Sequence, residues 1–308
     1  MIRFVLRRVF AALPVLWAVA TITFFLLRFA PGGPFDGDKK LPPEIEKNIR
    51  AKYHLDESLP RQYVRYMGQL ASGDLGVSYK YPDRSVVDII GEALPPSALV
   101  GAAALGLALL IGVPWGIASS LRRGSFWDWG GAIYTAAALA TPVLVLGPLL
   151  ALFFGLHLRW FPVAGFGHPA QLLLPAFALG LVLAAPVLRL TRAGMLEVAE
   201  QEFVRAARSR GLGGWLLVRR HMLRGGLLPL VQFLGPATAG ILTGTLVIEQ
   251  IFWIPGLGKY FVQSVFNRDY SLVLGLALFY TACLYAANLA VDILSSWMDP
   301  RIRTGGRS

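Results

Sequence analysis

The sequence predicts an all-α polytopic membrane protein with six transmembrane helices and a small extracytoplasmic subdomain between the first two. Three observations support this class: 55% of the 308 residues are hydrophobic, only 15% are charged, and apolar runs of membrane-spanning length recur. Soluble domains carry about 25% charged residues, and about 20 apolar residues cross a bilayer as a helix. A soluble protein with six buried helices would need polar helix faces, which these runs lack.

The apolar runs divide the chain into its expected parts. The six predicted spans are 9–27, 97–121, 130–156, 169–188, 225–248 and 271–291. Residues 1–30 then form the N-terminus and first span, 31–96 the subdomain, 97–298 the membrane core and 299–308 the C-terminal tail. The first run exceeds the 7–15 residues of a signal-peptide core and lacks a good cleavage site, so we expect it to be retained as a span.

The positions of the arginines predict the orientation of the chain. The N-terminus, residues 122–129, residues 189–224 and the C-terminus hold 16 of the 29 basic residues, whereas the short opposite loops hold few. Because cytoplasmic loops are enriched in Lys and Arg, both termini are expected on the cytoplasmic side. The net charge of +11 is thus explained by membrane topology, and no nucleic-acid partner is expected.

The subdomain at 31–96 is predicted to be helical. Pro43 suits the first turn of one helix, a second is expected at 60–70, residues 72–76 form a turn, and a third short helix is expected at 85–93. The segment is either a solvated cap or a surface that meets an extracytoplasmic partner.

The second and third spans are rich in Gly and Ala, which permits close helix packing in a membrane. Thr141-Pro142 and Gly147-Pro148 interrupt the third span, either at simple kinks or in a moving helix. The segment 251–261 is too short and too broken to span, so we expect an interfacial or re-entrant outer loop.

The loop at 190–228 is too long and too structured to be a simple connector. The fourth span is expected to continue as a helix past the membrane, followed by a short helix at 201–209 with Phe203, Ala206 and Ala207 on one face. Gly211 and the pair at 213–214 then permit a sharp turn. We interpret this basic loop as a docking surface for a partner outside the bilayer.

Three polar residues in the spans are candidate path or gate residues. Glu249 lies at the predicted outer edge of the fifth span, and Asn288 and Asp292 lie one turn apart on the sixth. An acid in a membrane is costly and is a functional candidate. A structural or interfacial role remains open for Glu249, because water is expected to reach that edge, and a solvated or hydrogen-bonded role remains open for Asp292.

Several classes of chemistry have no support. The sequence contains no phosphate-binding G-x-x-x-x-G-K-[ST] motif, the four histidines are scattered, and Cys283 is the single cysteine. No catalytic or metal site is therefore predicted. The spans also lack the mid-membrane ionisable groups of an ion-coupled transporter, so energy for transport would have to come from another subunit.

The loop resembles a known motif. Arg205-Ala-Ala followed by Gly211 is similar to the Glu-Ala-Ala…Gly motif of ATP-binding-cassette (ABC) importer permeases, in the variant of the peptide/nickel subfamily. Arg205 stands where that motif usually has Glu, and the usual Ile-x-Leu-Pro end falls on 221–224. Further segments that resemble this subfamily are 73–78, 141–142, 160–162, 252–258, 268–270 and 299–301. The outer segments 30–35, 41–44, 51–55 and 80–87 resemble the B-subunit branch of oligopeptide systems.

The resemblance implies a type I importer (MetI-like) fold in a bacterial inner membrane. It further implies a second permease, two ATPase subunits, an extracytoplasmic peptide-binding protein and peptide as substrate. The chain would be a transport subunit and no enzyme, with no cofactor, because ATP is bound by the partner subunits. Loop residues implied to couple to the ATPase are Phe203, Arg205, Ala206, Ala207, Arg208, Gly211 and Leu212. The alternatives are a permease for dipeptides, nickel, glutathione or oligosaccharides, and an ATPase-independent channel or receptor.

Overall fold

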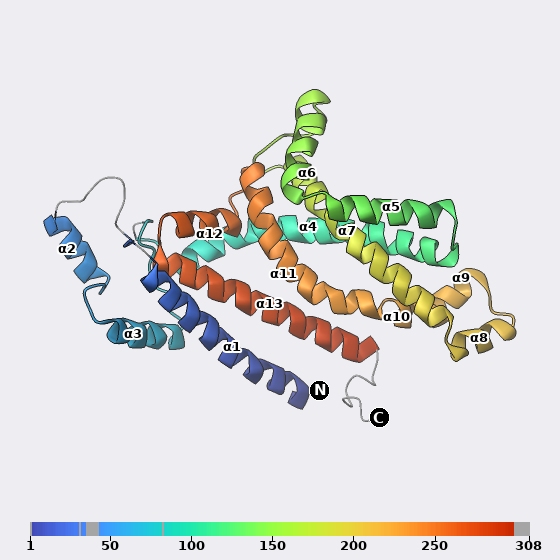
Figure 1. Ribbon diagram of the computed structural model, residues 1–308, viewed down its shortest axis with the longest axis horizontal. Coiled ribbons are helices and arrows are strands. Elements are labelled where there is room, and N and C mark those ends of the chain that lie inside the picture. The colour runs from blue at the N-terminus through green and yellow to red at the C-terminus, as the bar shows by residue number, and fades with distance from the viewer. Residues whose placement is uncertain (1, 31, 35–42, 82, 299–308) are drawn as a thin grey trace. The chain divides into compact units, whose positions relative to one another are not determined.

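The computed structural model describes residues 2–30, 32–34, 43–81 and 83–298 (Figure 1). Within these residues the regular structure is helical, apart from one isolated β-bridge between Val77 and Ser85. The predicted all-α class is therefore confirmed. The chain divides into two compact units: Leu6–Pro95 with Gly256–Ala282, and Met1–Val5 with Pro96–Pro255 and Cys283–Ser308. The predicted tail at 299–308 lies outside the described residues.

The first unit is built around the end of α1 (Ile2–Phe29), which includes the first predicted span and tolerates Pro14 in its interior. Phe24 is 1% exposed and stacks on Tyr66 of α3 (Leu59–Ala71) with ring centroids 5.6 Å apart. Arg28 donates from Nε to Gln62 Oε1 at 2.8 Å. Burial, reinforced by neighbouring Tyr63, raises the pKa of the Tyr66 phenol. These contacts hold α3 against the end of α1.

Two further helices of this unit, α2 (Pro43–Lys52) and α12 (Leu257–Phe266), correspond to segments with a sequence-based prediction. The predicted first helix of the subdomain is α2, which starts at Pro43 as expected. The expected outer loop at 251–261 is only partly irregular, because α12 begins inside it. Leu257 and Ser264, one face of α12, are buried. Leu257 packs in a cluster with Leu272 and Leu276, and Tyr260 and Phe261 pack against that cluster, so the helix is held by its apolar side chains.

Asp269 organises the polar centre of the same unit. Its side chain is fully buried and accepts hydrogen bonds from the Ser78 hydroxyl, from the Tyr79 amide at 3.1 Å and from the Leu272 amide at 3.2 Å. A buried carboxylate is stable when several donors satisfy it. Asp269 thereby joins the turn after α3 to the start of α13 (Tyr270–Met298).

The expected separate helix at 85–93 is wrong, because α4 runs without interruption from Val86 to Leu121 over 36 residues. Pro95 and Pro96 lie inside this helix. Proline removes a hydrogen bond to the carbonyl four residues earlier, and those carbonyls belong to Gly91 and Glu92. Both residues are exposed, so solvent can satisfy them and the helix continues.

The third predicted span is not a single helix. α5 (Phe126–Ala140) and the following helix, α6 (Val143–Leu150) with the π-helical η1 (Ala151–His157), meet at 101°. The break lies at Thr141-Pro142, where Thr141 is extended because a residue before proline avoids helical geometry. Pro148, by contrast, lies within α6 without ending it.

The second unit is centred on α7 (Pro169–Ala199), which packs against α5, α6, α10 and α11. Its contact with α4 depends on glycine: a Cβ at Gly112 would lie 2.6 Å from Val187 Cγ1, and one at Gly116 would lie 2.7 Å from Thr191 Cβ. The Gly-rich composition of the second span therefore produces the expected close packing. α7 also continues past residue 188, as predicted.

Among the described residues, four single helices are long and apolar enough to cross a membrane: Val5–Phe29, Val86–Leu121, Pro169–Ala199 and Tyr270–Met298. The bent pair of α5 and α6–η1 would be a fifth span. The fifth predicted run is covered by the 24-residue α11 (Leu228–Ile251). The count of six spans stays a prediction.

Candidate functional site

The loop after α7 folds into a chain of short helices. These are α8 (Glu202–Ser209), α9 (Gly214–Leu217), the π-helical η2 (Val218–Met222) and α10 (Leu223–Gly226). The helix expected at 201–209 is thus present as α8. The sharp turn after it uses left-handed backbone at Gly211 (φ +84°) and Gly214 (φ +56°), which glycine adopts without strain. Figure 1 shows α8 and α9 beyond the end of α7.

This loop has a small hydrophobic core of its own. The cluster consists of Met195, Val198, Val204, Ala207, Leu217, Val218 and Met222, from α7, α8, α9 and η2. Gly194 and Gly226 bring α7 and α10 together, since a Cβ at Gly194 would lie 2.2 Å from the Gly226 oxygen. A loop with a packed core holds its outer face in a defined position relative to α7.

The three residues predicted to share one face of α8 do not all lie on its exposed side. Ala207 is only 6% exposed and Val204 is fully buried, both in the core of the loop. Phe203 is 48% exposed, and Ala206 is exposed beside it. Ala207 is therefore corrected from a surface residue to a core residue. Val204 and Ala207, three residues apart, form the inward side of the helix.

The outward side of α8 is cationic as well as apolar. Arg205, Arg208 and Gly211 are exposed and Leu212 is half-buried. Within the described part of the chain, no side chain pairs with Arg205 or Arg208. The exposed surface therefore combines one large aromatic ring with arginines that have no internal counter-charge.

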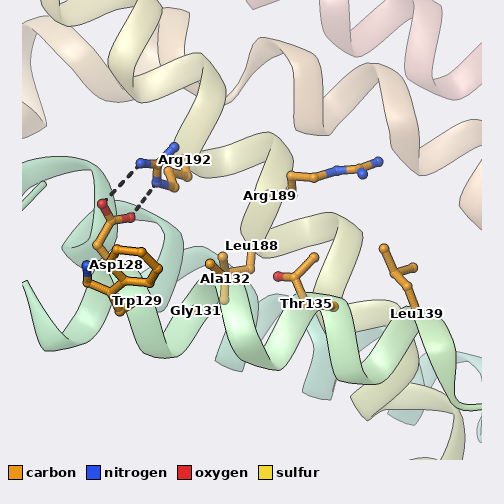
Figure 2. Close-up of a pocket in the computed structure, with 10 residues that line it drawn as sticks. Asp128, Trp129, Gly131, Ala132, Thr135, Leu139, Leu188, Arg189 and Arg192 are labelled. Carbon is orange, nitrogen blue, oxygen red and sulfur yellow. Dashed lines mark hydrogen bonds and ion pairs between the residues drawn. The ribbon is translucent and has the colours of Figure 1, made fainter. Parts of the chain in front are cut away.

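An ion pair joins α5 to α7, the helix that leads into α8. Arg192 of α7 donates from Nε to Asp128 Oδ1 at 2.6 Å and from Nη2 to Oδ2 at 3.1 Å (Figure 2). Asp128, on α5, also accepts from Ser119 Oγ of α4 at 2.7 Å and from the Gly124 amide at 3.0 Å. One carboxylate thus joins the ends of three helices.

Sequence reasoning missed Asp128. The available signal was a single acid at the start of a predicted span, in a loop otherwise rich in arginine, with another arginine at the end of the neighbouring span. The pairing of Asp128 with Arg192 depends on the antiparallel packing of α5 and α7. The local sequence pattern of either helix does not predict that packing.

A second arginine, Arg224 of α10, joins the end of the loop to the end of α13. Arg224 donates from Nε to the Met298 oxygen at 2.8 Å and from Nη2 to the Trp297 oxygen at 2.9 Å. Cationic side chains commonly bond the last carbonyls of a helix. An open cavity of about 780 Å³ lies between this contact and α8, with Phe203, Arg220 and His221 among its lining residues. The structured loop therefore offers a recess as well as a protruding helix.

The three candidate path residues occupy different surroundings. Glu249 is 1% exposed and accepts a hydrogen bond from Ser97 Oγ of α4 at 2.5 Å. The expectation that water reaches Glu249 is wrong, because its side chain is buried within the described structure. Asn288 faces α11, where a Cβ at Gly235 would lie 2.2 Å from its Oδ1. Asp292 is half-buried one turn further along α13.

Comparison with known proteins identifies the chain. Residues 112–304 match the family described as binding-protein-dependent transport system inner membrane component, and residues 1–98 match its N-terminal family. The chain belongs to this family of transport permeases. No group of three potential metal-ligating side chains occurs among the described residues of this permease.

Individual relatives extend over almost the whole permease. The oligopeptide transport system permease protein OppB of Salmonella typhimurium is 43% identical over 305 residues, covering 98% of this chain and 100% of that protein. OppB of Haemophilus influenzae is 40% identical with the same coverage. The dipeptide transport system permease protein DppB of Bacillus subtilis is 36% identical, covering 98% of each chain.

The fold is also similar to a solved transporter. An inward-facing crystal form of the MetNI methionine ABC transporter aligns with a TM-score of 0.56 and 17% sequence identity, covering 68% of this chain and 96% of that chain. This likeness shows the MetI-like permease fold. The chain is therefore a membrane permease component of an ABC importer, located in the inner membrane, and the ATPase is a separate subunit. The family also implies a binding protein as a partner.

Proposed function

We propose that this permease forms, with a second homologous permease, the path by which oligopeptides enter the cell. Two ATPase subunits drive the complex and an extracytoplasmic binding protein delivers the peptide. Both termini and the loop at 190–228 face the cytoplasm, and the chain itself binds neither ATP nor another cofactor. The relatives described as oligopeptide permeases support the substrate class.

The observation that carries the coupling part of the proposal is the organisation of α8. Its inward side, Val204 and Ala207, is fixed in the core of the loop, while Phe203 is 48% exposed beside exposed Arg205 and Arg208. An aromatic anchor next to arginine is typical of residues that dominate binding at protein interfaces. The core transmits movement of α8 to α7 because both contribute side chains to it.

Of the three candidate path or gate residues, only Glu249 is given a different role. Asn288 and Asp292 remain candidates for the path. Glu249 is proposed to hold α11 against α4 through Ser97, because it is buried.

A reconstituted complex tests the proposal. The permease, its second permease and both ATPases are placed in liposomes, and uptake of labelled tetrapeptide is measured with the binding protein outside and ATP inside. Uptake that needs every component supports the function. Uptake without the ATPases would contradict it and favour a channel.

Dipeptide transport is the second candidate, because relatives described as dipeptide permeases are 36% and 34% identical to the chain. Parallel assays with dipeptide and tetrapeptide distinguish the two. Uptake restricted to dipeptide would replace the oligopeptide assignment while leaving the coupling mechanism intact.

A further inference from the structure

A groove between α5 and α7 is not used by the proposed transport mechanism. It has a volume of about 530 Å³ and is lined by Asp128, Trp129, Gly131, Ala132, Thr135, Ala136, Leu139, Leu188, Arg189 and Arg192. Figure 2 shows these side chains between the two helices, with the Asp128–Arg192 pair at one end and Leu139 at the other. The groove therefore has an ion pair at one end, Arg189 and Thr135 along its length, and otherwise apolar or small side chains.

The length of the groove matches one leaflet of a membrane. Asp128 and Leu139 are separated along α5 by about 16 Å at 1.5 Å per residue. Half of a hydrocarbon core of about 30 Å is about 15 Å. The charged end coincides with the end of the apolar run on α7, so the groove extends from headgroup level to about the middle of the bilayer.

The charge of the groove favours an anion. Asp128 is neutralised by its two hydrogen bonds from Arg192, which leaves the positive charge of Arg189. Arg189 is exposed, has no hydrogen-bond or ion-pair partner within the described residues, and points away from that pair in Figure 2. Basic pockets between membrane helices at headgroup level bind anionic lipid headgroups.

The apolar wall contains a second feature that a ligand would satisfy. Thr135 is 9% exposed, lines the groove, and its buried hydroxyl has no hydrogen-bond partner in the described structure. Buried hydroxyls normally find a partner. The ester oxygens of a phospholipid lie between its phosphate and its acyl chains, and they are acceptors for such a hydroxyl.

We propose that this groove binds one anionic phospholipid from the adjoining leaflet. Its phosphate pairs with Arg189, an ester oxygen accepts from Thr135, and one acyl chain lies along Ala136 and Leu139. The lipid fills the space between α5 and α7 just above the Asp128–Arg192 pair, so it supports the helix ends from which the loop extends.

The test measures lipid preference beside the groove in the whole complex. Ile133, 66% exposed and outside the lining, is replaced by a cysteine carrying a fluorophore in a Cys283→Ser background. Nanodiscs contain either spin-labelled phosphatidylglycerol or spin-labelled phosphatidylcholine at the same mole fraction. We expect spin-labelled phosphatidylglycerol to quench the fluorophore with an affinity about fivefold higher than that of spin-labelled phosphatidylcholine. This is the preference for an anionic lipid that one arginine at the membrane surface provides.

Three variants make the result specific. Arg189→Gln should remove the preference, and so should Ala136→Phe, which fills the groove without changing its charge. Arg219→Gln removes an exposed arginine outside the groove and should retain the preference. Equal quenching by both lipids, or a preference that survives Arg189→Gln, would overturn the proposal. Shielding of position 133 from both lipids would overturn it too, because a protein partner would then cover the groove.

Discussion

Asp128 on α5 accepts two hydrogen bonds from Arg192, which lies in the last two turns of α7, at 2.6 and 3.1 Å. The side chains are 14% and 36% exposed. Such a bidentate pair fixes orientation as well as separation. The pair thus holds α5 against α7, the helix that precedes α8 and its proposed contact with the ATPase.

The first prediction concerns this pair. A double-mutant cycle with Asp128→Ala and Arg192→Ala should give a coupling free energy of about 1 kcal/mol, measured by thermal unfolding of the complex in detergent. The matched control is the pair Arg123–Glu200, 3.3 Å apart with side chains 55% and 67% exposed, where coupling should be close to zero. Additive effects at Asp128 and Arg192 would show that the pair contributes nothing.

The second prediction concerns the close approach of α7 and α10. Gly194→Ala places a Cβ 2.2 Å from the Gly226 oxygen, so the backbone must shift, and overpacking of this kind costs about 1–3 kcal/mol. The loop core should loosen, which faster proteolysis of 200–226 would reveal. Gly106→Ala on α4 is the control, since nothing lies within 4 Å of its new Cβ. Unchanged proteolysis of Gly194→Ala would refute the close contact.

The third prediction concerns the buried acid of α11. Ser97→Ala removes the donor at 2.5 Å from Glu249, and a buried acceptor that loses a partner costs about 1–3 kcal/mol. We expect a lower midpoint of thermal unfolding. An unchanged midpoint for Ser97→Ala would contradict a stabilising role for this hydrogen bond.

The fourth prediction concerns the outward side of α8. Phe203→Ala should leave the fold intact, since the ring is 48% exposed, but should weaken association with the ATPase by at least about tenfold, or 1.4 kcal/mol. Association is measured by co-purification at graded ATPase concentration. Phe266→Ala, 83% exposed on α12, is the matched control and should not change it. Equal effects of the two substitutions would sink the assignment of this face.

Much of the loop could be predicted from sequence. The extension of α7, the short helix at α8 and the glycine turn follow from spacing and residue type alone. Which side of α8 is buried could not be predicted as well. Ala206 and Ala207 are the same residue type, so composition does not show which of the two faces the core of the loop. Only the position of Val204, which packs with Met195 and Met222, decides which alanine is buried.

Other features depend on tertiary context. A separate helix was predicted at 85–93, yet α4 continues through Pro95 and Pro96, because the affected carbonyls belong to exposed residues. Thr141-Pro142 does break its helix, with an angle of 101° between the two segments, whereas Gly147-Pro148 does not end α6. Glu249 was placed at a water-accessible edge because it follows the fifth predicted span, and its hydrogen bond with Ser97, which is distant in sequence, could not be predicted.

Crosslinking from Ala206 tests most directly whether α8 contacts the ATPase. Ala206 is exposed, so a cysteine there, in a Cys283→Ser background, can carry a short photoreactive group without disturbing the loop core. In the assembled importer, position 206 should crosslink to an ATPase subunit, and position 266 should not. Absence of an ATPase crosslink at 206, or crosslinking there to the binding protein, would contradict the proposed coupling surface and the cytoplasmic orientation of the loop.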